Sequence, residues 1–297
     1  MKGVWRFSWI FILGFCFMRV EEDTRGDFLS RMQGALNSLN QLPTGVLLIQ
    51  KAQLKWNQPD ILGLLHYFSW GKASRTNTIL TRHFNPQTGR DDQERAITIF
   101  LKEDQTAVEL ALDLAHELVH ATSRSDFDPY DFSLTPAKYI YLALEGEGGE
   151  IEAVMKECQI GLEWMQHFGV LISRCQAYYR YSGNLGHQGK LWVDQSKVRQ
   201  DFYRVGKWEA DLRRDLGSEV QSFPLLSNHM PKFYSSISQA PYPFVLFHEF
   251  QEMNQLACDN SRKRLAGIIL SRDSISTLSS EVQIHRDLNR FIKSRCK

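Results

Sequence analysis

Two histidines stand four positions apart in a segment with the apolar pattern of a buried helix, and this spacing constrains the fold more than any other feature. Residues 114–122 read Leu-Ala-His-Glu-Leu-Val-His-Ala-Thr. On a helix, His116 and His120 lie on one face a turn apart, so their imidazoles can bind a single metal ion. The bare His-Glu-x-x-His pattern is expected by chance in roughly 0.02 of chains with this composition. The segment is therefore predicted to be a metal-binding helix.

The polar residues of this helix gather in one narrow stripe. With residues placed at steps of about 100°, the two histidines share the stripe with Glu109, Asp113 and Glu117, and apolar residues occupy the rest. Such a helix is largely buried. Unpaired polar groups in an apolar interior cost several kcal/mol, and a metal ion is a partner that removes this cost. The plainer interpretation is a stripe that faces solvent or forms internal hydrogen bonds.

Glu117 follows His116 directly and lies beside both histidines around the helix. In this position it would lie near water bound to the metal without itself binding the metal. Such a carboxylate can act as a general base that takes a proton from water as the water attacks a carbonyl. The residue types and their spacing therefore predict metal-assisted hydrolysis with Glu117 as the base.

Residues 115–121 resemble the active-site helix of the zincin metallopeptidases. The resemblance implies a Zn²⁺ ion, a peptide or protein substrate, and an edge strand before the helix that holds the substrate extended. Residues 96–101 are rich in β-branched side chains and lead within a few positions into the helix predicted for residues 105–122, so we expect them to form that strand. The resemblance covers only about residues 94–160.

A catalytic zinc site needs a third protein ligand and leaves its fourth position to water. The resemblance to gluzincin-type zincins implies a glutamate on a later helix, and Glu150 stands in that position. Glu150 borders the apolar face of the helix that begins there, so it can point towards the core. Val154 replaces the usual Asp or Asn, which removes the expected partner of a metal-bound histidine. Asp113 and Glu109 are alternatives for orienting one imidazole.

Two other residues compete for the third-ligand position. Glu147 belongs to the same acidic cluster as Glu150, and such a cluster can simply favour a helix N-terminus. Asp126 stands where the metzincin motif places its last ligand. Ser123, however, replaces the glycine that permits the sharp turn there, and no Met-turn follows. We therefore prefer Glu150, followed by Glu147 and then Asp126.

Lys2 and Arg6 precede an apolar run at residues 7–18, which is short for a membrane span and has the length and flanks of a signal peptide. Residues 1–20 are predicted to be that signal peptide, with an uncleaved anchor or a buried helix as the alternatives. We therefore expect an exported protein, periplasmic or secreted, whose only membrane contact would be this segment. Four later cysteines can form two disulfides in an oxidising compartment, in any of three pairings: Cys158, Cys175, Cys258 and Cys296.

The composition fits a globular chain of one large domain or two small ones. The 297 residues are 43% hydrophobic and carry a formal net charge of +1, which excludes a disordered chain and gives no bulk field for nucleic acid. We predict a mainly helical α+β fold: a zincin-like region at residues 21–182 and a helical region at 183–297, which can belong to the same domain. Strands are expected at residues 46–49 and 96–101, and helices at 22–41, 105–122, 136–144, 150–178, 195–215, 243–271 and 275–295.

The sequence favours a zinc-dependent metallopeptidase in which Glu117 is the base and His116, His120 and Glu150 hold the metal. The competing class is a non-catalytic helical envelope or interaction protein with a structural zinc site or no metal. A structural site is closed by a fourth protein ligand, whereas this chain offers a general base and no obvious fourth ligand. Hydrolysis of a substrate other than a peptide is a third alternative, because the motif specifies only the metal and the base. The sequence leaves the oxyanion-stabilising residue and the oligomeric state open.

Overall fold

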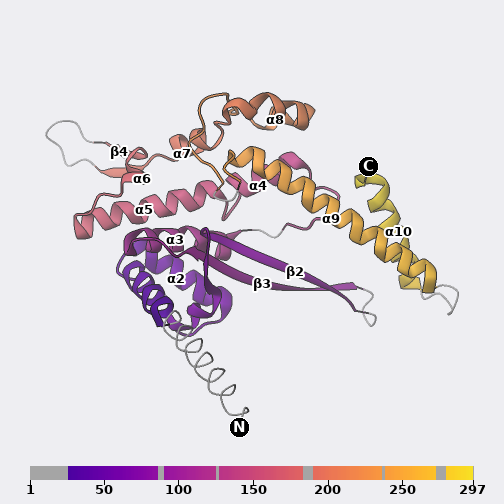
Figure 1. The fold of residues 1–297 in the computed structure, drawn as a ribbon, viewed down its shortest axis with the longest axis horizontal. Coiled ribbons are helices and arrows are strands. Elements are labelled where there is room, and N and C mark those ends of the chain that lie inside the picture. The colour runs from indigo at the N-terminus through magenta and orange to yellow at the C-terminus, as the bar shows by residue number, and fades with distance from the viewer. Residues whose placement is uncertain are drawn as a thin grey trace, which may run out of the picture.

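The computed structural model describes residues 26–85, 90–124, 127–182, 190–235, 238–271 and 279–296. The predicted signal peptide and the candidate ligand Asp126 lie outside the described residues. Within them the protein is mainly helical with a small mixed sheet, which confirms the predicted α+β class (Figure 1). After a helix at residues 26–39, the α-helices are α2 (Pro43–Trp56), α3 (Ala107–Ser123), α4 (Pro136–Glu145), α5 (Glu150–Phe168), α6 (Ser173–Gln176), α7 (Gln195–Phe202), α8 (Glu209–Leu216), α9 (Tyr242–Ser271) and α10 (Ser279–Arg295).

The main sheet has the strand order β1-β3-β2, so β3 (Arg90–Lys102) is its central strand. It pairs in parallel with β1 (Phe68–Gly71) and antiparallel with β2 (Arg75–Asn85). The prediction of a strand at residues 96–101 is confirmed, but the expectation that it is an edge strand is wrong. The edge strands of this sheet are β1 and β2, and the threonines of β2 made it look like a polar loop. Threonine is β-branched and suits a half-exposed strand, which explains why a polar segment forms this edge.

Helix α3 lies at the centre of the core. A capping box begins it, in which Thr106 and Glu109 satisfy each other's backbone N–H groups. Leu110, Leu114 and Leu118 are almost fully buried one turn apart, as expected for a helix in contact with other elements on most sides. Helices α2 and α5 and strand β3 pack against it. One continuous hydrophobic core includes residues from both regions predicted from the sequence.

Two expected elements have another form. Residues 46–49 were expected to be a strand but lie in α2, which Pro43 begins. A short apolar run is ambiguous by itself, and here Leu48, Ile49 and Ala52 bury one helical face. The helix expected at residues 150–178 ends at Phe168, because Gly169 adopts a left-handed conformation with φ of +70°.

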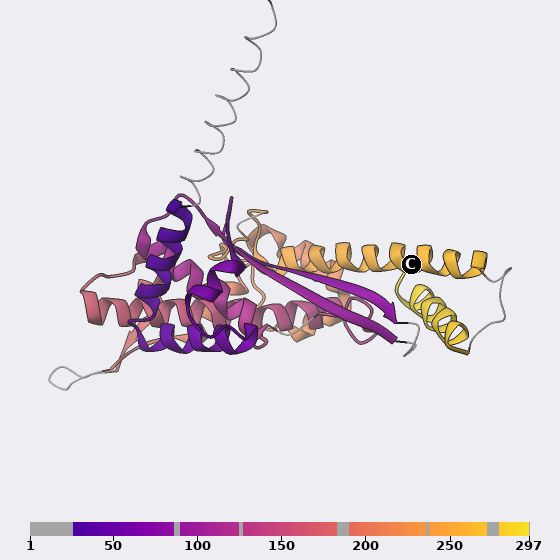
Figure 2. The ribbon, with the colours of Figure 1, turned by 90° about the horizontal axis from the view of Figure 1, so that it is seen from below.

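The C-terminal helices differ from expectation in one place. The helix expected at residues 195–215 is divided into α7 and α8, with Gly206 at φ +59° between them. The two last helices, α9 and α10, pack against each other. In both overall views α9 and the long β2–β3 hairpin extend from the helical body in the same direction (Figures 1 and 2).

Two disulfides join neighbouring helices. Cys158 of α5 is bonded to Cys175 of α6, and Cys258 of α9 is bonded to Cys296, directly after α10. These bonds decide among the three pairings that the sequence left open. Among the described residues, none of the helices combines the length and the apolar character needed to cross a bilayer. Two short strands, β4 (Tyr179–Tyr181) and β5 (Leu191–Val193), form a separate antiparallel pair.

Candidate metal site and adjoining cavity

Three predicted ligands come together where α3 meets the start of α5. His116 and His120 project from α3, and Glu150 is the first residue of α5. The Nε2 atom of His116 lies 3.4 Å from Oε2 of Glu150, and Nε2 of His120 lies 3.4 Å from Oε1. All three side chains are buried or nearly so. The structure thus brings together two imidazoles and one carboxylate, the donor set of many catalytic zinc sites.

The other ring nitrogen of each histidine already has a partner. His120 Nδ1 lies 2.8 Å from the carbonyl oxygen of Gly148, which can only accept a hydrogen bond, so Nδ1 must donate. His116 Nδ1 lies 3.1 Å from Oε2 of Glu157 and donates to that carboxylate. In the neutral tautomers, both Nε2 lone pairs therefore face the carboxylate of Glu150. Lone pairs and an anion attract one another only through a cation between them.

The spacing of the donor atoms fits a metal ion. Two atoms that each lie about 2.0–2.1 Å from a tetrahedral Zn²⁺ are roughly 3.3–3.4 Å apart. The two distances from an Nε2 atom to a carboxylate oxygen of Glu150 are both 3.4 Å, longer than a good hydrogen bond. A single ion would satisfy all three groups at once, whereas a proton can bridge only one pair. The residues present therefore fit a zinc ion.

The titration of these groups follows from their surroundings. Burial alone would lower the pKa of His116, but the carboxylates of Glu150 and Glu157 outweigh it and hold that pKa well above its usual value. Burial alone would raise the pKa of Glu150, but the two imidazoles hold it well below its usual value. The site therefore strongly favours positive charge between the histidines and Glu150.

Glu117 is buried beside the three ligands but is not one of them. Its Oε2 accepts a hydrogen bond from Oγ1 of Thr76, at 2.8 Å, and the same hydroxyl lies 3.1 Å from the Glu117 carbonyl oxygen. Burial raises the pKa of Glu117, although His120, His116 and Thr76 act in the opposite direction. The edge strand β2 thus fixes the orientation of the carboxylate that the sequence predicts to be the base.

A chain of charged groups supports His116 from behind. Glu157 lies on α5 two turns after Glu150, and its Oε1 lies 2.6 Å from Nε of Arg174. Arg174 also pairs with Asp113, at 2.8 Å. Asp113 in turn accepts hydrogen bonds from Ser74, at 2.5 Å, and Gln105, at 2.6 Å. Glu157 therefore is the hydrogen-bond partner of His116 that was expected at position 154, where the chain has valine. Its spacing of seven residues from Glu150 places it on the same helical face, and this is the signal that sequence analysis missed.

The remaining candidates have other partners. Glu147 is exposed and pairs with Lys51 at 3.3 Å, so it is not the third ligand. Glu109 belongs to the capping box at the start of α3 and does not orient an imidazole. Asp113 contributes only through Arg174. Glu150 is the one residue of the acidic cluster at 145–152 that lies against both histidines.

Tyr242, the first residue of α9, adds a phenol from the C-terminal region. Burial raises its pKa well above the usual value, and the nearby carboxylates of Glu150 and Glu117 and a hydrogen bond with Glu150 add to this effect. The residue is therefore a neutral hydrogen-bond donor beside the three ligands. Sequence analysis assigned no role to it, since it is separated from Glu150 by about 90 positions and follows no motif.

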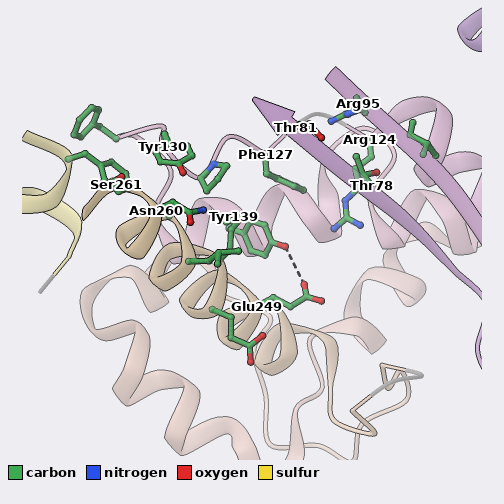
Figure 3. Close-up of a pocket in the computed structure, with 18 of the residues that line it drawn as sticks. Thr78, Thr81, Arg95, Arg124, Phe127, Tyr130, Tyr139, Glu249, Asn260 and Ser261 are labelled. Carbon is green, nitrogen blue, oxygen red and sulfur yellow. Dashed lines mark hydrogen bonds between the residues drawn. The ribbon is translucent and has the colours of Figure 1, made fainter. Parts of the chain in front are cut away.

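A cavity of about 1200 Å³ adjoins the site (Figure 3). His120 is part of its wall. The β2–β3 hairpin lines one side with Thr76, Thr78 and other residues, and α9 lines another with Glu249 and Met253. Residues of α10 complete the far end. A cavity of this size can accept several residues of a peptide.

Comparison with protein-family models, with curated proteins and with solved structures found no match to this chain. The arrangement of the site therefore has to be interpreted from its own geometry and chemistry.

Proposed function

We propose that the protein is a zinc-dependent metallopeptidase with a zincin-like core. The observation that carries this proposal is the pair of 3.4 Å separations between Glu150 and the Nε2 atoms of the two histidines. Beside them lies buried Glu117, which is not one of the three ligands and can act as the base. His116, His120 and Glu150 would hold the ion. A bound Zn²⁺ supplies Lewis-acid polarisation of a carbonyl and activates water.

The chain's own residues have distinct parts in this proposal. Glu117 accepts a proton from water and delivers it to the leaving amine, and Thr76 holds its carboxylate in place. Tyr242 keeps its proton because its pKa is raised, so its hydroxyl can donate a hydrogen bond to negative charge that develops on the substrate carbonyl oxygen. Glu157 and Gly148 keep both histidines in the tautomer that a metal requires.

A peptide substrate is supported by the edge strand. In the sheet order, β2 has a strand partner on one side only within the described residues. An edge strand offers unpaired backbone groups to which an extended peptide can bind. Because Thr76 of β2 contacts the base, this edge begins beside the reacting groups.

Export is part of the proposal. Two disulfides between helices fit an oxidising compartment, where such bonds persist. A protein made with residues 1–20 and recovered from the cell envelope or the medium should therefore contain both disulfides, as peptide mapping without reduction can show.

The test combines metal content with peptide cleavage on the full chain. We expect about one zinc ion per chain by elemental analysis, lost in His116→Ala and Glu150→Gln and retained in Glu117→Gln. A mixed peptide library should be cleaved by the parent and not by Glu117→Gln. Zinc bound without cleavage of any peptide would favour a structural site in an interaction protein. A folded parent that binds no supplied zinc would overturn the proposal.

A further inference from the structure

Arg124 is the first residue after α3, and its side chain points into the cavity beside the metal ligands (Figure 3). Its Nε atom is buried and has no hydrogen-bond partner. Within the described residues its guanidinium forms no ion pair, and its Cζ lies 5.3 Å from the centroid of the Phe127 ring. A buried nitrogen donor without an acceptor is costly, so this group calls for a ligand.

The missing partner is an anion rather than a cation. The guanidinium of an arginine is a cation with several N–H donors and no acceptor. Glu249, an acidic group of the same cavity, accepts a hydrogen bond from the Tyr139 hydroxyl at 3.2 Å (Figure 3). The charge of Arg124 acts to lower the pKa of Glu249, but within the described residues the two side chains form no ion pair. Among the described residues that line the cavity, Arg124 is thus a cationic group with a buried donor that lacks an acceptor.

The backbone fixes Arg124 relative to the metal ligands. Its N–H donates to the carbonyl oxygen of His120 at 3.1 Å, one helical turn back. Gly148 packs so closely on the Arg124 backbone that a Cβ there would overlap its nitrogen atom. The carbonyl oxygen of that same glycine accepts the hydrogen bond from His120 Nδ1. The loop at Gly148 thus fixes both the orientation of the His120 imidazole and the position of the Arg124 backbone.

The distance to the metal ligands limits where the anion can be. Four residues of helix advance roughly 6 Å, which is the rise from His120 to Arg124. An extended peptide advances about 3.3 Å per residue. An anionic group that reaches Arg124 therefore lies about one or two residues from a carbonyl held at the three ligands.

We propose that Arg124 binds a carboxylate of the substrate one or two residues from the bond that is cut. The proposal rests on the proposed peptidase function and specifies its substrate class. The carboxylate can be the C-terminal α-carboxylate or the side chain of Asp or Glu, since both offer a planar pair of oxygens to a guanidinium. Part of the wall favours a bulky apolar neighbour, because it contains Phe127, Phe132, Met253, Leu256 and Phe291.

Binding measurements test this without relying on turnover. The full chain carrying Glu117→Gln is loaded with zinc and titrated into four fluorescein-labelled hexapeptides, followed by anisotropy. Two peptides differ only in a free or an amidated C-terminus. The other two are amidated and differ only in Glu or Gln at the position before the terminus. In at least one of the two pairs, we expect the peptide that has the carboxylate to bind at least about tenfold more tightly than its neutral partner.

Variants assign that preference to Arg124. Arg124→Gln should remove it, and Arg124→Lys should keep part of it, because lysine retains the charge but not the planar pair of donors. Arg264→Gln removes the same charge from another wall of the cavity and should leave the preference unchanged. Equal zinc content and equal melting temperature of all variants show that the site remains folded.

The outcomes separate this proposal from the proposed function. Equal or absent binding of all four peptides, or a preference that survives in Arg124→Gln, would overturn the carboxylate site. Tighter binding of a lysine-containing peptide than of the Glu peptide would overturn it too. Cleavage by the parent without any such preference would support the proposed peptidase function and overturn the carboxylate site. A preference that depends on Arg124 without any cleavage would leave a peptide-binding site and remove the peptidase.

Discussion

Buried Glu157 and exposed Arg174 form an ion pair, with Oε1 2.6 Å from Nε, and each stands next to one cysteine of the Cys158–Cys175 disulfide. The bond between α5 and α6 therefore holds the two charged groups together. Because the other oxygen of Glu157 contacts His116 Nδ1, this covalent link reaches a predicted metal ligand in two steps. The disulfide and the candidate metal site are therefore connected through Glu157 and Arg174.

Loss of this support should weaken zinc binding. In Glu157→Gln the imidazole of His116 no longer donates to an anion, and we expect zinc affinity to fall by about 10- to 100-fold. Arg174→Gln should act in the same direction, because it leaves Glu157 without its counter-ion. Competition with a fluorescent chelator measures the affinity. Arg180→Gln, which removes an exposed pair with Asp194, is the control, and an unchanged affinity in Glu157→Gln would contradict the role of Glu157.

Gly148 should tolerate no side chain. It has a φ of +69°, and an added Cβ would overlap the backbone of Arg124. We expect Gly148→Ala to lower the free energy of unfolding by about 1–3 kcal/mol or more and to weaken zinc binding, because the carbonyl that orients His120 must move. Gly169→Ala is a matched control, since its φ is +70° with open space around it. Urea unfolding of both variants measures the difference, and equal effects would refute the steric argument.

Thr76 should matter for turnover rather than for metal binding. Thr76→Val keeps the shape of the side chain but removes the hydrogen bond to Glu117 Oε2. We expect kcat to fall by about tenfold, because one net hydrogen bond to a charged group is worth about 1.5–3 kcal/mol, while zinc content stays the same. Thr78→Val changes a neighbouring threonine of the same cavity wall and should have little effect. Equal kcat values in the two variants would contradict the role of Thr76 in holding Glu117.

Asp113 predicts how stability depends on pH. Burial alone would raise its pKa, but Arg174, Ser74 and Gln105 outweigh burial and hold the pKa below its usual value. The unfolded chain, with an Asp pKa of about 3.9, then binds the proton more readily. The contribution of Asp113 is therefore complete above about pH 5 and is lost as pH falls through the folded pKa.

Chemical unfolding of the parent and of Asp113→Asn checks this expectation. The difference in free energy of unfolding between them should be largest near neutral pH and should shrink below about pH 4. Asp27→Asn is the control, because Asp27 is 61% exposed in a surface pair with Arg31, and such pairs contribute little. A difference for Asp113→Asn that stays constant down to about pH 3 would contradict the assigned cause.

The sequence by itself determined the features that depend on local periodicity. The spacing of four on a helix placed His116 and His120 on one face, and the helical phase of Glu150 turned it inward. The same reasoning gave most helices correctly. It failed at residues 46–49, where a short apolar run is compatible with a strand or a helix, and packing against α3 decided for the helix.

Only the tertiary structure decided which distant residues complete the site. Thr76 reaches Glu117 across 41 positions, and Arg174 reaches Asp113 across 61, each from an element with no motif of its own. Tyr242 comes from a helix that sequence analysis placed in another region. Such contacts depend on how the helices and the sheet bury their apolar faces together, which no local pattern encodes. The proposed metal ligands can therefore be predicted from the sequence, whereas their supporting groups and the cavity at Arg124 arise from the packing of the core.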